Sequence, residues 1–94
     1  MSIIGHISTK EHYGLRLVIN ISKSYYTKEP VSLYDVSTKE KISMKYLEQI
    51  IIPLKKSGLV ESVRGRSGGY IMKKNPNAIS LKEVLYLLGS DEKI

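Results

Sequence analysis

The segment from residue 60 to residue 74 constrains the fold of this chain most, because it cannot belong to a helix. It reads VESVRGRSGGYIMKK, two short runs with alternating apolar residues on either side of the loop RGRSGG at 64–69. Glycine adopts positive φ without a steric penalty, so the pair Gly68 and Gly69 is expected to fix a tight turn. The sequence therefore predicts a β-hairpin that carries the two loop arginines beyond the protein surface. An ordinary surface hairpin with solvated arginines is the alternative.

Capping patterns predict helices on both sides of this hairpin. A serine followed three residues later by an acid can accept a hydrogen bond from the third helical amide, while the acid bonds back to the serine amide. The pattern occurs at Ser8/Glu11, Ser32/Asp35 and Ser80/Glu83, which together with a start at Ser43 predicts helices 8–26, 32–39, 43–57 and 80–89.

The predicted helix 43–57 is amphipathic and contains one anomaly, Pro53. Proline lacks an amide hydrogen and its ring clashes with the carbonyl of Gln49, so we expect a kink near 49–53 or a helix that restarts at Pro53. Gly58 is expected to end the helix. The predicted buried stripe comprises Tyr46, Leu47, Ile50 and Leu54, and the opposite face comprises Met44, Lys45, Glu48, Gln49 and Ile52.

Only two or three residues, around Glu40 to Ile42, separate the helices 32–39 and 43–57. A short turn between two helices is typical of a helix-turn-helix, and the hairpin that follows supplies a wing. The predicted fold class is α+β, mostly α: a winged helix-turn-helix with a two-stranded β-hairpin wing. A chain of 94 residues with 41% apolar content fits one domain, residues 1–94.

Positive charge is concentrated in one segment. Nine lysines and arginines and three glutamates lie between residues 39 and 74, so this segment carries the whole formal charge of +6. A basic surface confined to one part of a protein attracts polyanions, and a solvated face is the alternative.

Composition argues against several other classes. The chain has no cysteine, which removes disulfides and thiolate metal ligands, and no apolar run of about 18 residues that could cross a membrane. The start of the chain lacks the regions of a signal peptide, so we expect a cytoplasmic protein. His6 and His12 have no acid or nucleophile at a useful spacing, and the glycine loop is followed by a strand and not by the helix of a phosphate-binding loop. We therefore do not expect an enzyme.

The chain resembles the Rrf-two family of bacterial winged-helix regulators, the IscR/NsrR/CymR type. The likeness is carried in order by KYLEQ at 45–49, PLKKSGLV at 53–60, SVRG at 62–65 and GGY at 68–70, and it extends to both outer helices. It implies sequence-specific binding to double-stranded DNA, to a palindromic operator, as a homodimeric transcriptional regulator, usually a repressor.

The resemblance also implies which residues contact DNA. Gln49 can bond adenine bidentately, Glu48 can accept from the cytosine amino group, and Lys45 can reach guanine or a phosphate. An ion pair with Lys45, or simple exposure beside Ile52, is the alternative for Glu48. Arg66 could enter a narrow A·T-rich minor groove. The implied set, of which the first four would lie near the sugar-phosphate backbone, is Ser8, Thr9, Lys10, Tyr13, Ser43, Lys45, Tyr46, Glu48, Gln49, Arg64, Arg66 and Ser67.

The chain departs from the family where it stops, at Ile94. The cluster-binding cysteines and the long dimerisation helix of the family would follow this point, so we expect no iron-sulfur cofactor and a signal that comes through another route, such as a regulatory protein partner. The remaining candidates for a dimer interface are the first and last helices, although their apolar residues are typical of a core. These candidates include Val84, Leu85, Leu87 and Leu88.

Three further positions carry expectations about structure. Lys41 stands where the family often has glycine, and a left-handed conformation there would cost roughly 1 kcal/mol. Gly14 inside the first helix costs a similar amount relative to alanine. Tyr25 and Tyr26 are expected to pack in the core, with a ligand pocket as the alternative.

The main alternative function is a winged-helix protein-interaction module with only nonspecific nucleic-acid binding. RNA binding is disfavoured, because no exposed aromatic residues interleave the basic ones.

Overall fold

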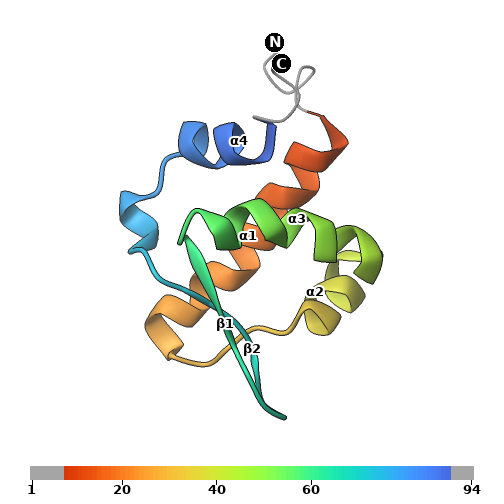
Figure 1. Cartoon of the computed structure of the whole chain (residues 1–94), viewed down its shortest axis with the longest axis vertical. Coiled ribbons are helices and arrows are strands. Elements are labelled where there is room, and N and C mark those ends of the chain that lie inside the picture. The colour runs from red at the N-terminus through yellow and green to blue at the C-terminus, as the bar shows by residue number, and fades with distance from the viewer. Residues whose placement is uncertain (1–7, 90–94) are drawn as a thin grey trace.

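The computed structural model describes residues 8–89, which form four α-helices and a two-stranded antiparallel sheet (Figure 1). The predicted winged helix-turn-helix and the order of its elements are confirmed. A short 3-10 helix between the wing and the last helix was not predicted. The elements are α1 Thr9–Thr27, α2 Leu33–Glu40, α3 Met44–Lys56, β1 Val60–Val63, β2 Gly69–Met72, η2 Pro76–Ala78 and α4 Leu81–Gly89.

The capping serines begin the helices as predicted. The Ser8 hydroxyl accepts from the Glu11 amide at 3.1 Å, and the Glu11 carboxylate accepts from the Ser8 amide at 3.0 Å. The same reciprocal pair forms at the start of α4. At Ser32 only the serine half of the box is present among the described residues, consistent with the shorter side chain of Asp35. Each cap stabilises its helix by about 1 kcal/mol.

Helix α3 runs through Pro53 without a break, so the expected restart at this residue is wrong. The physical reason lies in the packing on both sides of the proline: Ile50, Ile51 and Leu54 are all buried and hold the helix against the core. Ile51 was missing from the predicted stripe, and Tyr46 is only half-buried. The opposite face is exposed as predicted, at Met44, Lys45, Glu48, Gln49 and Ile52.

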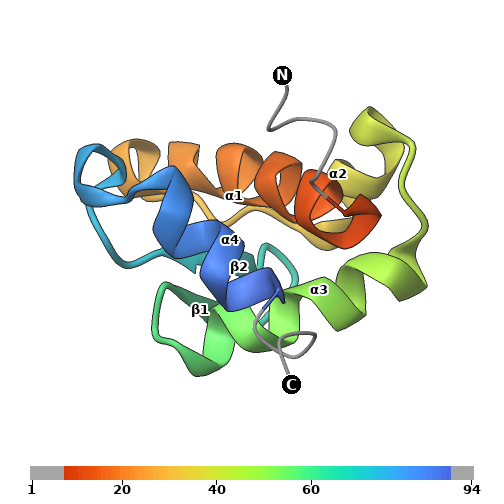
Figure 2. The ribbon, with the colours of Figure 1, turned by 90° about the horizontal axis from the view of Figure 1, so that it is seen from above.

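The core lies where α1, α3 and α4 meet, and Figure 2 shows α4 lying across the other two helices. Gly14 is buried in this contact, and a Cβ atom at that position would overlap Leu88 Cδ1. The glycine that weakens α1 as an isolated helix therefore permits the close approach of α4. The fully buried side chains at the centre are Leu17, Ile21, Leu47, Ile50, Leu54 and Leu88.

The wing turn differs in detail from the prediction. Gly68 N donates to Gly65 O at 3.0 Å, so the tight turn lies between these two glycines and has Arg66 and Ser67 at its centre. Gly65 supplies the positive φ, 107°. Gly69 has a separate reason to be glycine: a Cβ there would lie 2.5 Å from the carbonyl oxygen of Val31.

The edge of β2 that faces away from β1 is also paired. Tyr70 exchanges two backbone hydrogen bonds with Val31, at 2.8 and 2.9 Å, and Met72 N donates to the buried hydroxyl of Ser24 at 2.7 Å. The wing is therefore fastened to the chain before α2 and to α1. Among the helices of residues 8–89, none has the length and apolar content needed to cross a membrane.

Candidate nucleic-acid interface

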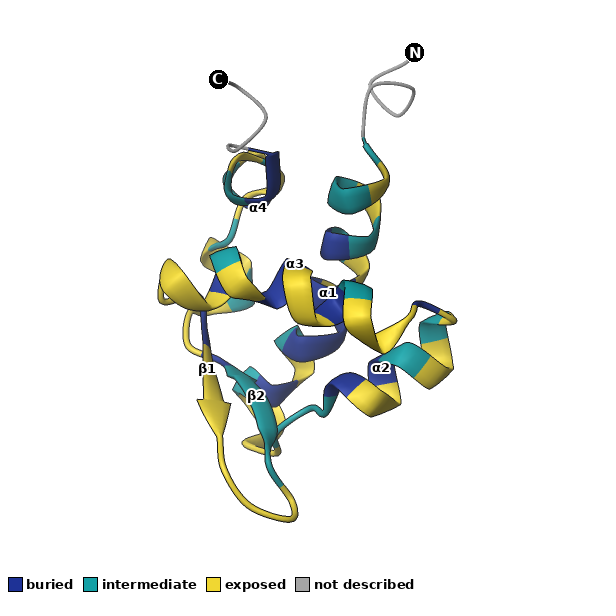
Figure 3. Cartoon of the chain, turned by 45° about the vertical axis from the view of Figure 1, so that its right-hand side comes forward, coloured by how far each residue is buried: buried dark blue, intermediate teal, exposed yellow. Residues whose placement is uncertain are grey.

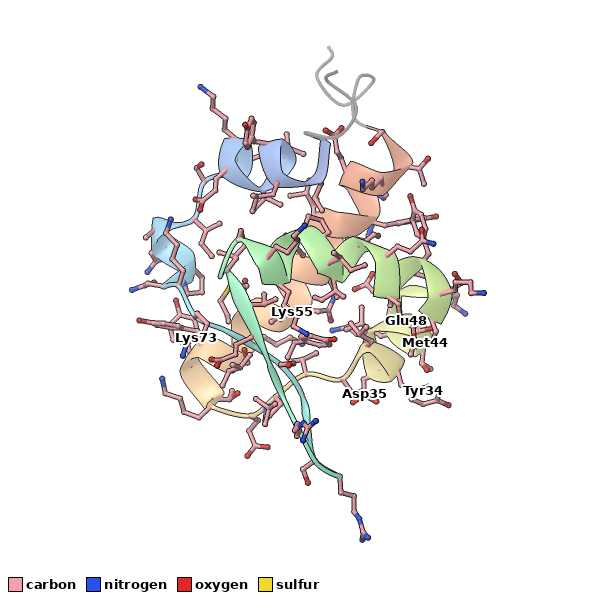
Figure 4. The ribbon with its side chains drawn as sticks, viewed as in Figure 1. Tyr34, Asp35, Met44, Glu48, Lys55 and Lys73 are labelled. Atoms are coloured by element: carbon pink, nitrogen blue, oxygen red, sulfur yellow. The ribbon has the colours of Figure 1, made fainter. Side chains whose placement is uncertain are left out.

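Helix α3 presents an exposed face on the same side of the molecule as the wing (Figure 3). Residues four apart lie close to one line along a helix, so Met44, Glu48 and Ile52 form one row and Lys45 and Gln49 form the next. Figure 4 labels Met44 and Glu48 where the first half of α3 meets α2. All the groove-facing residues that the resemblance implies on α3 are therefore exposed together.

Glu48 does not pair with Lys45. The ion pairs formed among residues 8–89 do not include either side chain, so this alternative for Glu48 is not observed. The exposed carboxylate of Glu48 can therefore accept a hydrogen bond from a ligand.

The start of α1 adjoins the start of α3 through two tyrosines. The rings of Tyr13 and Tyr46 meet edge to face with centroids 5.8 Å apart, and both residues are half-buried. Aromatic pairs of this geometry stabilise by about 0.5–1.5 kcal/mol beyond their burial. In this structure both tyrosines act mainly in packing, and their contact joins the second turn of α1 to the first turn of α3.

Ser8 and Ser43 keep a donor for a ligand. Each hydroxyl oxygen accepts a backbone amide as a helix cap, at 3.1 Å in both cases. A serine hydroxyl also carries one hydrogen, so it can donate at the same time. A hydroxyl held at a helix start can therefore donate to a phosphate oxygen.

The wing loop is cationic and unneutralised. Arg64, Arg66 and Ser67 are exposed, and neither arginine pairs with an acid of residues 8–89. The wing's ion pair lies at its base, where Lys73 Nζ is 3.1 Å from a carboxylate oxygen of Glu61. Positive charge therefore remains at the tip, away from the core.

A polar network positions the turn that leads into α3. Asn20 is 5% exposed, and its side-chain amide donates to Glu40 Oε2 and to the Arg16 carbonyl, both at 2.8 Å. Arg16 also donates to Glu40 Oε1 at 2.9 Å. The hydrogen bond from Asn20, and then Arg16, hold the pKa of the Glu40 carboxyl below its usual range.

This network fastens the end of α2 to α1, directly before Lys41, which has φ 58° and ψ 47°. Lys41 therefore adopts the left-handed conformation whose cost was considered from the sequence. Sequence reasoning missed the network because Arg16 and Glu40 lie 24 positions apart, and no local pattern links them.

Other predicted residues do not form a site. His12 is exposed against the ring of Tyr13, His6 lies outside the described residues, and residues 8–89 contain no group of histidine, cysteine, aspartate or glutamate that could hold a metal ion. Tyr25 packs against the core as expected, but Tyr26 is 61% exposed, which corrects the expectation for that residue.

The apolar residues of α4 that were candidates for a dimer interface are largely used within the domain. Val84 and Leu88 are buried in the core, and Leu85 and Leu87 are half-buried. An apolar groove of about 240 Å³ lies instead between α1 and the segment from η2 to α4. Its rim includes Ile19 and Leu81.

The chain matches the family described as Rrf2, iron-dependent transcriptional regulator, over residues 7–94. The chain belongs to the Rrf2 family. The HTH-type transcriptional regulator CymR of Bacillus subtilis (strain 168) is 39% identical over 82 residues, which is 87% of this chain and 59% of CymR. The HTH-type transcriptional regulator IscR of Klebsiella pneumoniae (strain 342) is 38% identical over 79 residues, 84% of this chain and 48% of IscR.

Solved structures of Rrf2 relatives agree with the fold. The structure of CymR, described as the global cysteine regulator of B. subtilis, has a TM-score of 0.82 and 39% identity, and it covers 87% of this chain and 63% of that chain. T. potens IscR has a TM-score of 0.81 and 38% identity, with 93% of this chain and 64% of that chain covered. The chain thus spans about half to two thirds of the length of these relatives.

Proposed function

We propose that this Rrf2 chain is a sequence-specific DNA-binding transcriptional regulator, and that it acts as a repressor in the cytoplasm. The observation that carries the proposal is the shared exposure of α3 and the cationic wing tip on one side of a winged helix-turn-helix. In this fold the exposed helix lies in the major groove and the wing lies at the adjacent minor groove or phosphates.

The proposed contacts divide into base reading and phosphate positioning. Lys45, Glu48 and Gln49 read base edges, Glu48 by accepting from a cytosine amino group and Gln49 by a bidentate bond to adenine. Arg66 enters the minor groove or contacts a phosphate, together with its neighbours in the wing. The remaining proposed contacts are Ser8, Thr9, Lys10, Tyr13, Ser43, Tyr46, Arg64 and Ser67, which position the backbone of the duplex.

We extend the proposal to a homodimer on a palindromic operator, formed by single winged-helix domains of residues 1–94. The exposed apolar residues around the α1–α4 groove, Ile19 at 66% and Leu81 at 54%, support an association surface. Sedimentation of the free chain tests this part. A monomer at all concentrations would contradict it.

We also propose that the inducing signal reaches these residues through a regulatory protein partner or another route that needs no thiolate, because none of the 94 residues is a cysteine that could hold an iron-sulfur cluster.

Selection of duplexes from a random pool, followed by mobility shifts, tests the DNA-binding proposal. We expect a selected duplex to stay bound in the presence of excess nonspecific duplex. Removing Arg66 as Arg66→Ala should reduce the slope of log affinity against log salt by about 0.9. Lys82→Ala, which removes an exposed cation from α4, is the control and should leave the slope unchanged.

Weak binding that salt abolishes and that shows no sequence preference would favour the protein-interaction module instead. An unchanged slope in Arg66→Ala would show that this arginine is only solvated.

A further inference from the structure

Two apolar side chains stand on the exposed face of α3, on either side of a carboxylate. Ile52 is 54% exposed and Met44 is 36% exposed, and each lies four residues from Glu48. At about 100° per residue, Glu48 and Ile52 lie at least about 100° from the buried positions Leu47, Ile50 and Leu54, whereas Met44 lies at the margin of the exposed face, about 60° from Leu47. Ile52 therefore points out of the domain, and Met44 lies at the edge of the exposed face with 36% of its surface exposed.

The surroundings of this row are polar and cationic. Lys45 and Lys55 are exposed on the same helix, and the exposed loop of the wing carries Arg64 and Arg66. Figure 4 labels Lys55 on α3, and it labels Tyr34 and Asp35 of α2 near Met44 and Glu48. None of these cations pairs with an acid among residues 8–89. Charge complementarity therefore favours a polyanion over an apolar protein as the occupant of this face.

DNA offers one apolar group at the base edges of the major groove, the C5 methyl of thymine. An apolar side chain on a groove-facing helix can therefore make a favourable contact with this methyl group, whereas it cannot hydrogen-bond to the polar base edges. The carboxylate of Glu48, between the two apolar residues, accepts from the amino group of cytosine.

We propose that Met44 and Ile52 pack against thymine methyl groups, so that the row on α3 selects a cytosine flanked by thymine-containing pairs. This inference rests on the proposed DNA binding and specifies the bases that are read. Four helical residues rise about 6 Å, and successive base pairs are about 3.4 Å apart. The selected thymines therefore lie roughly two base pairs from the cytosine that Glu48 reads.

The experiment removes single methyl groups from the DNA. The duplex that the wild-type chain selects from a random pool is compared with copies in which each thymine in turn is replaced by deoxyuridine. This change deletes the C5 methyl and leaves every hydrogen-bonding group of the base edge in place. At two positions in each half-site we expect the dissociation constant to rise about threefold to fourfold, the effect of one lost apolar methyl contact.

Protein variants assign each methyl group to its side chain. Met44→Ala should abolish the thymine-to-deoxyuridine difference at one position, and Ile52→Ser should abolish it at the other. Tyr26→Ser is the control, because it removes an exposed, largely apolar side chain from the end of α1 outside the α1–α4 groove, and it should keep both differences. All three positions are exposed, and circular dichroism melting shows whether each variant is folded.

Specific binding that is equal for thymine and deoxyuridine at every position would overturn this inference and leave the proposed regulator in place. Differences that persist in both α3 variants would overturn it too. Failure to bind any selected duplex specifically would overturn both proposals.

Discussion

Replacing Ser24 with alanine is expected to lower the free energy of unfolding, because it leaves the buried backbone amide of Met72 in the wing without a hydrogen-bond acceptor. In the antiparallel wing Lys73 N donates to Leu59 O at 2.9 Å, so Lys73 faces β1 and the preceding residue, Met72, faces away. Met72 N donates instead to Ser24 Oγ at 2.7 Å, and both residues are almost fully buried, at 2% and 0% exposure. Because the site is buried, we expect the Met72 amide to be left without a partner when the hydroxyl is removed.

A buried donor without a partner costs about 1–3 kcal/mol. Ser22→Ala provides a matched control, because the Ser22 hydroxyl donates only to the Val18 carbonyl of its own helix, at 2.8 Å. Both variants gain the higher helix propensity of alanine. Both also lose one hydrogen bond within α1, which in the case of Ser24 is the bond from its hydroxyl to the Ile21 carbonyl. The difference between the two variants therefore isolates the tie to Met72.

Urea unfolding of the two variants, followed by circular dichroism, measures this difference. We expect Ser24→Ala to unfold with a free energy about 1–3 kcal/mol lower than that of Ser22→Ala, and to melt about 4–8 °C lower for each kcal/mol in a domain of this size. Equal stability of the two variants would refute the reasoning.

Two further predictions concern the connection between α2 and α3. Because Asn20 and Arg16 lower the pKa of the Glu40 carboxyl, Glu40 contributes stability that is present above the pKa of the unfolded chain and is lost as the pH falls through the lower folded pKa. The free energy of unfolding should therefore fall more steeply below about pH 4.5 in the wild type than in Glu40→Gln, as urea titrations at several pH values would measure; parallel curves would contradict this. Lys41→Gly should raise the free energy of unfolding by about 0.5–1 kcal/mol because it relieves a left-handed lysine, whereas Lys39→Gly, in the last turn of α2, should lower it by about 1 kcal/mol. If Lys41→Gly also failed to raise the free energy of unfolding, Lys41 would not be strained.

Local patterns were sufficient to predict most of the fold. The serine caps at residues 8, 32, 43 and 80 and the exposed face of α3 depend on residues within about four positions of one another, and all of them were predicted. The wing was predicted as a hairpin, but its turn was placed on Gly68 and Gly69. The observed turn lies at residues 65–68, because Gly69 is already paired with Val63 in the sheet and lies against the Val31 carbonyl.

The candidate site divides in the same way. The exposure of Lys45, Glu48 and Gln49 follows from helical periodicity and was predicted. The half-buried state of Tyr46 was not, because it depends on the ring of Tyr13 on another helix.

By itself the sequence determined the helix starts, the hairpin, the amphipathic face of α3 and the concentration of positive charge, since each arises from neighbours along the chain. Only the tertiary structure decided how the wing and the turn before α3 are held. Ser24 meets Met72 across 48 positions, and Asn20 meets Glu40 across 20. Such bonds form when packing brings distant polar groups together, and a buried polar group must then find a partner.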